Sequence, residues 1–369
     1  REREDDVRES VLFSPCAGPD IDALNKLEEA DEAAKGSKCG GADDEDDDGG
    51  GDRDYGAMAD GILDRLVALR DSDSDDQSVE PLRCRVLYIP TAMYALNPNS
   101  NNTPGKQRQR ARSDGKKRRN VVVEIVNDLL NGDEGGGGNN PERETRGAEV
   151  LAVTLDLSDG SVKQPAICSG SGSGSGSGHA PPSSSDDDAS SGLFPSDGRE
   201  ALTSWNPHLI YVEGGNTFWL THCLEEGRWG DDLRGAVCGD GAAMYVGKSA
   251  GAILAGERVE TATWKGWDDP SVVDSRPTYD DWTDHPGLSL AGPRTSFFPH
   301  MNDDWIELVE ERRTTMEERE GTTTGGDDES GVAGDEKKGA AGGRVLCLRE
   351  NEACCVDGDR GEVFLVEGQ

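Results

Sequence analysis

Apolar and aromatic residues are scarce in this 369-residue chain, of which 33% is hydrophobic and 5% is aromatic. Globular domains usually contain about 45–50% apolar residues, so we expect part of the chain to be disordered and the rest to hold a richer core. No stretch approaches the roughly 18 consecutive apolar residues of a membrane helix, which argues against an integral membrane protein.

Positive charge is also scarce. The chain has 38 Lys and Arg against 74 Asp and Glu, a formal net charge of −36. Such a chain repels nucleic acid and anionic lipid, so we expect neither as a partner. Eight basic residues nevertheless lie between Lys106 and Arg119. A loop and the solvated face of the following helix would explain them, and a nuclear-localisation or nucleic-acid segment is the alternative.

The nine cysteines form no framework. Their number is odd and no C-x-x-C pair occurs, so neither a zinc site nor a thioredoxin-type site is indicated. We expect reduced thiols. No charged-then-apolar leader opens the sequence, and we expect a cytoplasmic protein.

Composition divides the chain into two regions. Residues 1–81 are acidic and rich in glycine, and we expect them to be largely disordered apart from short apolar patches at 21–27 and 62–69. Residues 82–369 form the second region, a single α/β domain. We expect disordered insertions within it at about 132–144, 169–198 and 321–343, because their Gly, Ser and Asp content buries little apolar surface.

Strand and helix patterns alternate in the second region. Strands are predicted at 85–90, 149–157, 208–213, 243–246, 288–291, 296–298, 344–348, 353–356 and 363–366. Helices are predicted at 120–131, 217–226, 231–238, 250–256 and 302–319. This order favours an α/β fold in which helices cover both faces of a mostly parallel sheet.

The sharpest motif is GKSAG at 247–251, which fits G-x-S-x-G between a predicted strand and a predicted helix. A sharp strand-to-helix turn projects the Ser249 hydroxyl from the sheet edge, and amide groups at the helix start can hold an oxyanion. Ser249 is therefore the candidate nucleophile. A glycine-rich turn for tight helix packing is the alternative.

A serine nucleophile needs a base and a carboxylate. Among the five histidines, His300 follows the apolar run 296–299 at a predicted strand end, where catalytic groups of parallel sheets collect. The carboxylate that orients it could be Asp268 or Asp269, which lie together in a segment with Trp264, Trp267 and Pro270. The residues alone leave that choice open.

Four motifs together resemble the dipeptidase E family of serine peptidases, which includes the alpha-aspartyl dipeptidases and has cyanophycinase as a relative. They are YIPTA at 88–92, EGGNTF at 213–218, GKSAGA at 247–252 and PH at 299–300, in a resemblance that spans roughly 84–320 and the C-terminal strands. The resemblance implies a three-layer α/β sandwich of the flavodoxin-like or class I glutamine amidotransferase-like kind. It also implies hydrolysis of short peptides through an acyl-enzyme, and it implies no metal or organic cofactor.

Carried over residue by residue, the resemblance implies that Ser249 is the nucleophile, His300 the base and Asp268 the acid, with Asp269 as the alternative. It further implies an oxyanion hole formed by the amides of Gly215 and Ala250. Asn216, where cyanophycinase usually has Asp, favours the dipeptidase branch and is a candidate substrate-binding residue. The acidic and Ser-Gly insertions depart from the family pattern, and no aspartyl-binding residues are identifiable.

Two other functions use the same features. An esterase or other acyl hydrolase would employ the same triad, although the lack of an HGGG-type motif argues against the usual lipase fold. A catalytically silent protein whose acidic arms bind basic partners is the other alternative. The tryptophans at 264, 267 and 282 would line a substrate pocket or pack a loop over the sheet.

Overall fold

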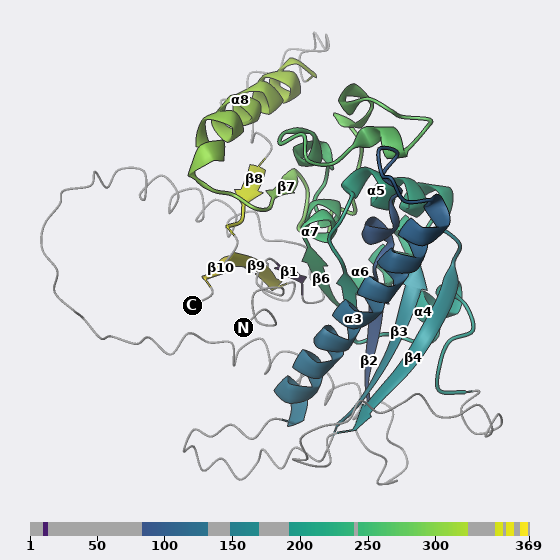
Figure 1. Cartoon of the computed structure of the whole chain (residues 1–369). Coiled ribbons are helices and arrows are strands. Elements are labelled where there is room, and N and C mark those ends of the chain that lie inside the picture. Colours follow the sequence, from purple (N-terminus) through teal and green to yellow (C-terminus); the bar gives the residue numbers. More distant parts are fainter. Residues whose placement is uncertain are drawn as a thin grey trace, which may run out of the picture.

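The computed structural model describes residues 10–13, 83–131, 148–169, 192–239, 243–323, 344–349, 352–357 and 362–367. Eight strands form one sheet in the order β10-β9-β1-β6-β5-β2-β3-β4 (Figure 1). Their bounds are Ser10–Phe13 (β1), Arg83–Ile89 (β2), Glu149–Asp156 (β3), Ser161–Ser169 (β4), Leu209–Val212 (β5), Met244–Lys248 (β6), Glu352–Asp357 (β9) and Glu362–Glu367 (β10).

The centre of this sheet is parallel. Strands β6, β5, β2 and β3 are paired in parallel, so their carboxyl ends meet at one edge. Strand β4 is antiparallel to β3, and β10 is antiparallel to β9. Strand β1 joins the two parts of the sheet, antiparallel to β6 and parallel to β9. A separate pair consists of β7 (Thr295–Phe298) and β8 (Arg344–Cys347).

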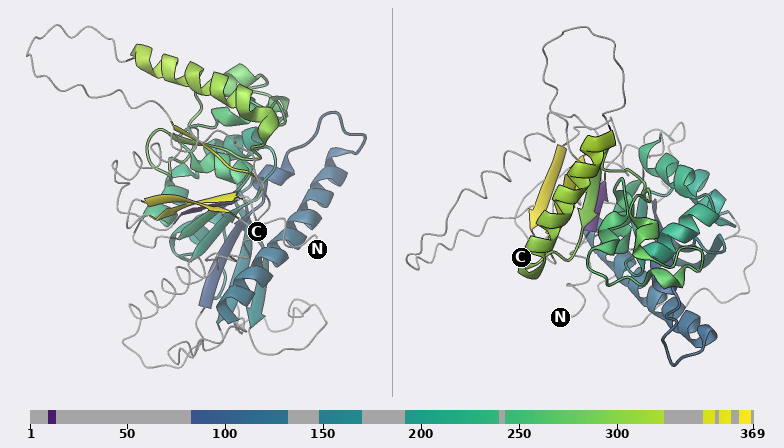
Figure 2. Two further views of the ribbon diagram at one scale, coloured as in Figure 1. Left: turned by 90° about the vertical axis from the view of Figure 1, so that its left-hand side faces the viewer. Right: turned by 90° about the horizontal axis from the view of Figure 1, so that it is seen from above.

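Helices cover both faces of the sheet, as Figure 2 shows. Helix α3 (Pro104–Asn131) covers one face, where Val122 and Val126 pack with Val86 and Tyr88 of β2. The other face packs against helices α4 (Gly198–Thr203), α5 (Thr217–Glu226), α6 (Gly230–Cys238) and α7 (Ala250–Ala255). Alternate residues of one buried strand thus enter different cores. The predicted three-layer α/β fold with a mostly parallel sheet is confirmed.

Helix α8 (Ile306–Thr323) packs beside the β7–β8 pair. Val309 and Met316 of this helix share a core with Trp264, Phe298 and Val345. Helix α8 therefore holds β7, and the residues that follow β7, against the main body.

No helix among the described residues is long and apolar enough to cross a membrane.

Two predictions of local structure are wrong. The basic run 106–119 is not a loop, because helix α3 already begins at Pro104. Residues 288–291 form no strand: Ser289 has φ +52°, and the segment bonds instead to the backbone of residues 254–256. Of the predicted insertion 169–198, the structure describes Ser169, which ends β4, and residues 192–198, where the carbonyl of Leu193 accepts a hydrogen bond from Trp205.

Other predictions fall outside the described residues. The apolar patches at 21–27 and 62–69 lie there, as do residues 132–144, 170–191 and 324–343 of the predicted insertions. Within the acidic N-terminal region the structure describes β1, which no sequence pattern indicated. Helix α8 continues three residues into the predicted insertion at 321–343, because it ends at Thr323.

Candidate active site

The nucleophile candidate lies in a strained turn. Ser249 joins β6 to α7 with φ +48° and ψ −105°, a backbone conformation that residues other than glycine rarely adopt. A Cβ on Gly251 would lie 2.3 Å from the carbonyl oxygen of Val212, and one on Gly247 would lie 2.5 Å from the backbone of Gly251. The two glycines therefore allow the close backbone contacts that force Ser249 outward.

His300 reaches the nucleophile from a different element. It follows β7 and Pro299 in a left-handed conformation with φ +56°. Its Nε2 lies 2.9 Å from Ser249 Oγ, within hydrogen-bond distance. The Lys265 ammonium donates to the carbonyls of Pro299 (2.5 Å) and His300 (2.7 Å). These two bonds hold the unusual backbone that aims the imidazole.

Asp268 lines the same cavity as Ser249 and His300. Its Oδ2 accepts the backbone N–H of Thr217 at 2.7 Å. Burial raises the pKa of this carboxyl, while hydrogen bonding from Thr217 and the positive charge of His300 act in the opposite direction. A buried carboxylate beside an imidazole is the arrangement that stabilises a transient imidazolium.

Asp269 uses its side chain differently. Its Oδ1 accepts the N–H of Ser271 at 2.9 Å and caps the 3₁₀ helix η3 (Pro270–Val272). Asp269 is not among the residues that line the cavity. Of the two acids that the sequence left open, Asp268 is therefore the one placed with Ser249 and His300.

A second glycine turn follows β5 and lies against the nucleophile. Gly215 has φ +144°, and a Cβ there would lie 2.5 Å from the carbonyl of Ala92 in the 3₁₀ helix η1 (Thr91–Tyr94). A Cβ on Gly214 would lie 3.0 Å from Ser249 Cβ. The turn thus brings Gly214 beside Ser249, and the next residue is Gly215, whose amide the resemblance predicts as one donor of the oxyanion hole. Ala250, the predicted second donor, is the first residue of α7.

Asn216 connects this turn to the segment that carries Asp268 and Asp269. Its Oδ1 accepts the N–H of Trp219 at 2.9 Å and caps helix α5, while its Nδ2 donates to the carbonyl of Asp269 at 3.0 Å. Both groups of the amide are therefore used within the protein. The substrate-binding role predicted for Asn216 stays a prediction beside this structural one.

Glu213 was missed by the sequence reasoning. Its side chain is 2% exposed and accepts the Tyr88 hydroxyl at 2.8 Å, Arg118 Nη1 at 3.3 Å and the N–H of Gly214 at 3.0 Å. Burial raises the pKa of Tyr88, and the Glu213 charge raises it further. The acid immediately before Gly214-Gly215, together with a basic run on the covering helix, is the signal that could have indicated this network.

The cavity that contains Ser249, His300 and Asp268 combines apolar walls with polar groups. It is lined by Thr217, Ser249, Ile253, Thr261, Ala262, Lys265, Trp267, Asp268, Phe298, Pro299 and His300. Trp264 and Trp282 are buried in the core, whereas 59% of Trp267 is exposed. Of the three tryptophans considered from the sequence, only Trp267 lines this cavity.

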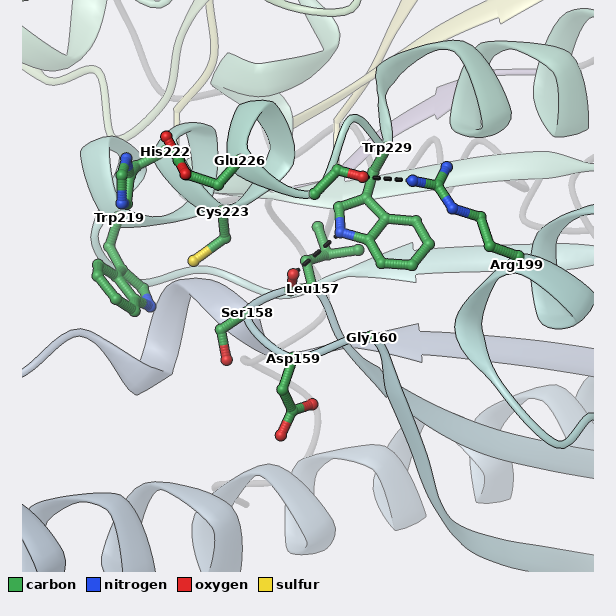
Figure 3. A pocket seen from close by; sticks show the side chains of 11 residues that line it. Leu157, Ser158, Asp159, Gly160, Arg199, Trp219, His222, Cys223, Glu226 and Trp229 are labelled. Atoms are coloured by element: carbon green, nitrogen blue, oxygen red, sulfur yellow. Dashed lines mark hydrogen bonds between the residues drawn. The ribbon is translucent and has the colours of Figure 1, made fainter.

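A larger cavity of about 530 Å³ lies along α5 and is shown in Figure 3. Ser249, His300 and Asp268 do not line it. Its one guanidinium, that of Arg199, donates to the carbonyls of Gly227 and Arg228, pairs with Asp232 and stacks over Trp229. These contacts already satisfy the charge, and the candidate catalytic residues line the smaller cavity. Within the described part of the chain, no three His, Cys, Asp or Glu side chains are grouped as a metal site would require.

A family profile matches the segment of the chain that contains these residues. Residues 196–324 match the sequence profile of peptidase family S51, the dipeptidase E family, and this segment contains Ser249, His300, Asp268 and both glycine turns. The resemblance that the motifs indicate is confirmed over this segment. No curated protein sequence is significantly similar to the chain.

A crystal structure from Listeria monocytogenes EGD-e, provisionally assigned as a peptidase E protein, is similar to this chain. The sequence identity is 14% and the TM-score is 0.38. The alignment covers 83% of this chain and 95% of that one.

Proposed function

We propose that this chain is a serine-type peptidase that hydrolyses short peptides, aspartyl dipeptides among them, through a Ser249–His300–Asp268 triad. The 2.9 Å contact between His300 Nε2 and Ser249 Oγ carries this proposal. Two supporting features are the strained backbone of Ser249 and the family match over residues 196–324.

In the first step Ser249 Oγ attacks the peptide carbonyl carbon while His300 Nε2 takes the hydroxyl proton. Asp268 orients the imidazole and stabilises its positive charge. The amides of Gly215 and Ala250 donate to the oxyanion. The C–N bond then breaks, His300 gives its proton to the leaving amine, and an acyl-enzyme on Ser249 remains.

In the second step water replaces the leaving amine. His300 takes a proton from the water, whose oxygen attacks the acyl carbon. The ester bond to Ser249 then breaks, and the serine oxygen recovers its proton from His300. The reaction consumes one peptide and one water and releases two amino acids when the substrate is a dipeptide.

The test is hydrolysis of a library of Asp-X and X-Asp dipeptides by the purified full chain, beside Ser249→Ala and His300→Ala. We expect activity that both substitutions reduce by several orders of magnitude. Equal rates in the three proteins would contradict the triad. Absence of dipeptide cleavage together with absence of labelling by a serine-reactive phosphonate would overturn the proposed function. A panel of p-nitrophenyl esters separates an esterase from a peptidase.

A further inference from the structure

Trp267 is unusually exposed for a tryptophan. Among the described residues, the large apolar side chains that are exposed are Ile167, Trp267, Tyr279 and Ile306, and Trp267 has the largest exposed fraction, 59%. It is also the one of these four that lines the cavity containing Ser249 and His300. An exposed aromatic ring in a catalytic cavity provides apolar contact area for a ligand.

Neighbouring side chains hold the ring in place. The Trp267 ring lies 5.6 Å from the His300 ring and 5.6 Å from the Trp305 ring, the latter at 81°. The Lys265 ammonium lies 4.4 Å from its centroid, in a cation–π contact. A ring already held on several sides loses little freedom when a ligand packs on it, which favours binding.

The proposed reaction determines which part of the substrate meets this ring. His300 gives its proton to the leaving amine, so the leaving residue must lie on the His300 side of the cleaved bond. Trp267 packs directly on His300 and lies on that same side. We infer that Trp267 forms the subsite for the side chain of the leaving amino acid and selects aromatic and large apolar residues there.

The positive charge of Lys265 beside the Trp267 ring further restricts which leaving residues bind well. The Lys265 ammonium stands against Trp267 and would repel a basic side chain placed on the ring. The leaving residue of a dipeptide also carries a free carboxylate, which the same ammonium attracts. The preferred leaving residues are therefore Phe, Tyr, Trp, Leu and Met, with Lys and Arg disfavoured. This inference rests on the proposed function.

The experiment fixes the acyl residue and varies the leaving one. Dipeptides ending in Phe, Leu, Gly and Lys are compared by kcat/KM in the full chain and in Trp267→Ala, Trp267→Phe and Ile167→Ala. We expect the wild type to favour Phe over Gly by roughly tenfold, the size of one aromatic contact. Trp267→Ala should bring that ratio to within about twofold, and Trp267→Phe should retain most of it.

Ile167→Ala is the matched control, because Ile167 is an exposed apolar residue (42%) on the edge strand β4, outside the cavity. It should keep the wild-type ratio. Phosphonate labelling of Ser249 checks that each variant is folded. A wild type that cleaves dipeptides without favouring Phe, or a Trp267→Ala variant that keeps the preference, overturns the subsite alone. A wild type that neither cleaves dipeptides nor takes the phosphonate label overturns the proposed function and the subsite with it.

Discussion

Two glycine-rich turns at the carboxyl edge of the sheet differ in backbone strain. The turn after β6 places a residue other than glycine, Ser249, in a strained conformation at φ +48°. The turn after β5 places a glycine, Gly215, at φ +144°, where no strain arises because it has no Cβ. The adjacent strands β5 and β6 bring these turns together.

The chemistry is divided between the two turns. The first turn carries the oxygen that is proposed to react, that of Ser249. The second turn carries no reactive side chain, yet Asn216 and Thr217, which continue it, bond to Asp269 and Asp268. Of the two turns, the one that carries Ser249 is therefore the strained one, while the residues that continue the other are organised by hydrogen bonds between side chains and backbone.

Replacing the strained residue should have the largest effect on turnover. We expect Ser249→Ala to lower kcat by roughly five orders of magnitude, because no other group can form the acyl-enzyme. Single-turnover hydrolysis of the best dipeptide measures this loss. Retention of even a hundredth of the wild-type rate would remove Ser249 from the proposed role.

A second substitution at Ser249 distinguishes the effect of backbone strain on stability from the effect of the hydroxyl on turnover. Ser249→Gly should be as inactive as Ser249→Ala but more stable to urea by about 1–2 kcal/mol, because only glycine accepts this backbone without strain. Equal unfolding midpoints for the two variants would mean that the turn stores no strain.

Asp268→Asn should lower kcat by roughly a thousandfold or more, because the amide oxygen is drawn to Thr217 N–H and the amide NH₂ then faces the imidazole. Asp269→Asn is the matched control and should change kcat by only a few-fold. A larger loss at Asp269 than at Asp268 would reverse the assignment.

Asp268 also predicts a pH dependence of stability. Its pKa is raised in the folded protein, so the folded state binds the proton more tightly than the unfolded chain. The ionised group therefore costs stability at pH values above the raised pKa. We expect Asp268→Asn to be the more stable protein at pH 7, and its advantage to shrink as the pH falls through the raised pKa and to vanish below about 3.8, the value of an unperturbed Asp. Urea unfolding of both proteins between pH 3 and 8 measures the difference.

The second turn should respond to an added methyl group. A Cβ on Gly215 would meet the backbone of Ala92 at 2.5 Å, in a conformation that L residues rarely adopt. We expect Gly215→Ala to lower kcat by about a hundredfold through loss of one oxyanion donor, and to destabilise the fold by about 1–3 kcal/mol. Normal turnover in a folded Gly215→Ala protein would assign the oxyanion hole elsewhere.

The smallest effect is expected at Glu213. Glu213→Gln keeps the shape of the side chain but removes the charge that Arg118 pairs with and faces an NH₂ toward groups that donate. We expect kcat to fall by about tenfold or less with KM nearly unchanged, because the Gly214-Gly215 backbone shifts relative to Ser249. Arg118→Met, which removes only the outer partner, should give a still smaller change. A change confined to KM would indicate that Glu213 acts on substrate binding.

The sequence predicted those parts of the molecule whose signal is local. Apolar runs ending in turns gave β2, β5 and β6, and the flanking glycines of Ser249 identified the nucleophile candidate. The parts that were missed depend on context. The first half of α3 is charged and has no apolar period, so nothing marked it as a helix. Strand β4 contains Pro165, which an edge strand tolerates but which weakens any strand prediction.

The site was predictable to a similar degree. The order of the motifs and the strand ends indicated Ser249 and His300, because such ends converge in parallel sheets. Asp268 and Asp269 differ in no sequence property that decides between them. Only the fold shows that one accepts a backbone N–H from α5 while the other caps η3.

Strand β1 pairs with strands that lie far from it in the sequence. It pairs with residues roughly 240 positions away in β6 and roughly 340 positions away in β9, so its contacts carry a large loop-closure entropy. Pairings of such high contact order form slowly. We expect the seam between β6 and β9 to close late in folding and to open early in native-state hydrogen exchange. The parallel core β6-β5-β2-β3, from which the nucleophile turn projects, is paired without that seam and should fold and persist as its own cooperative unit.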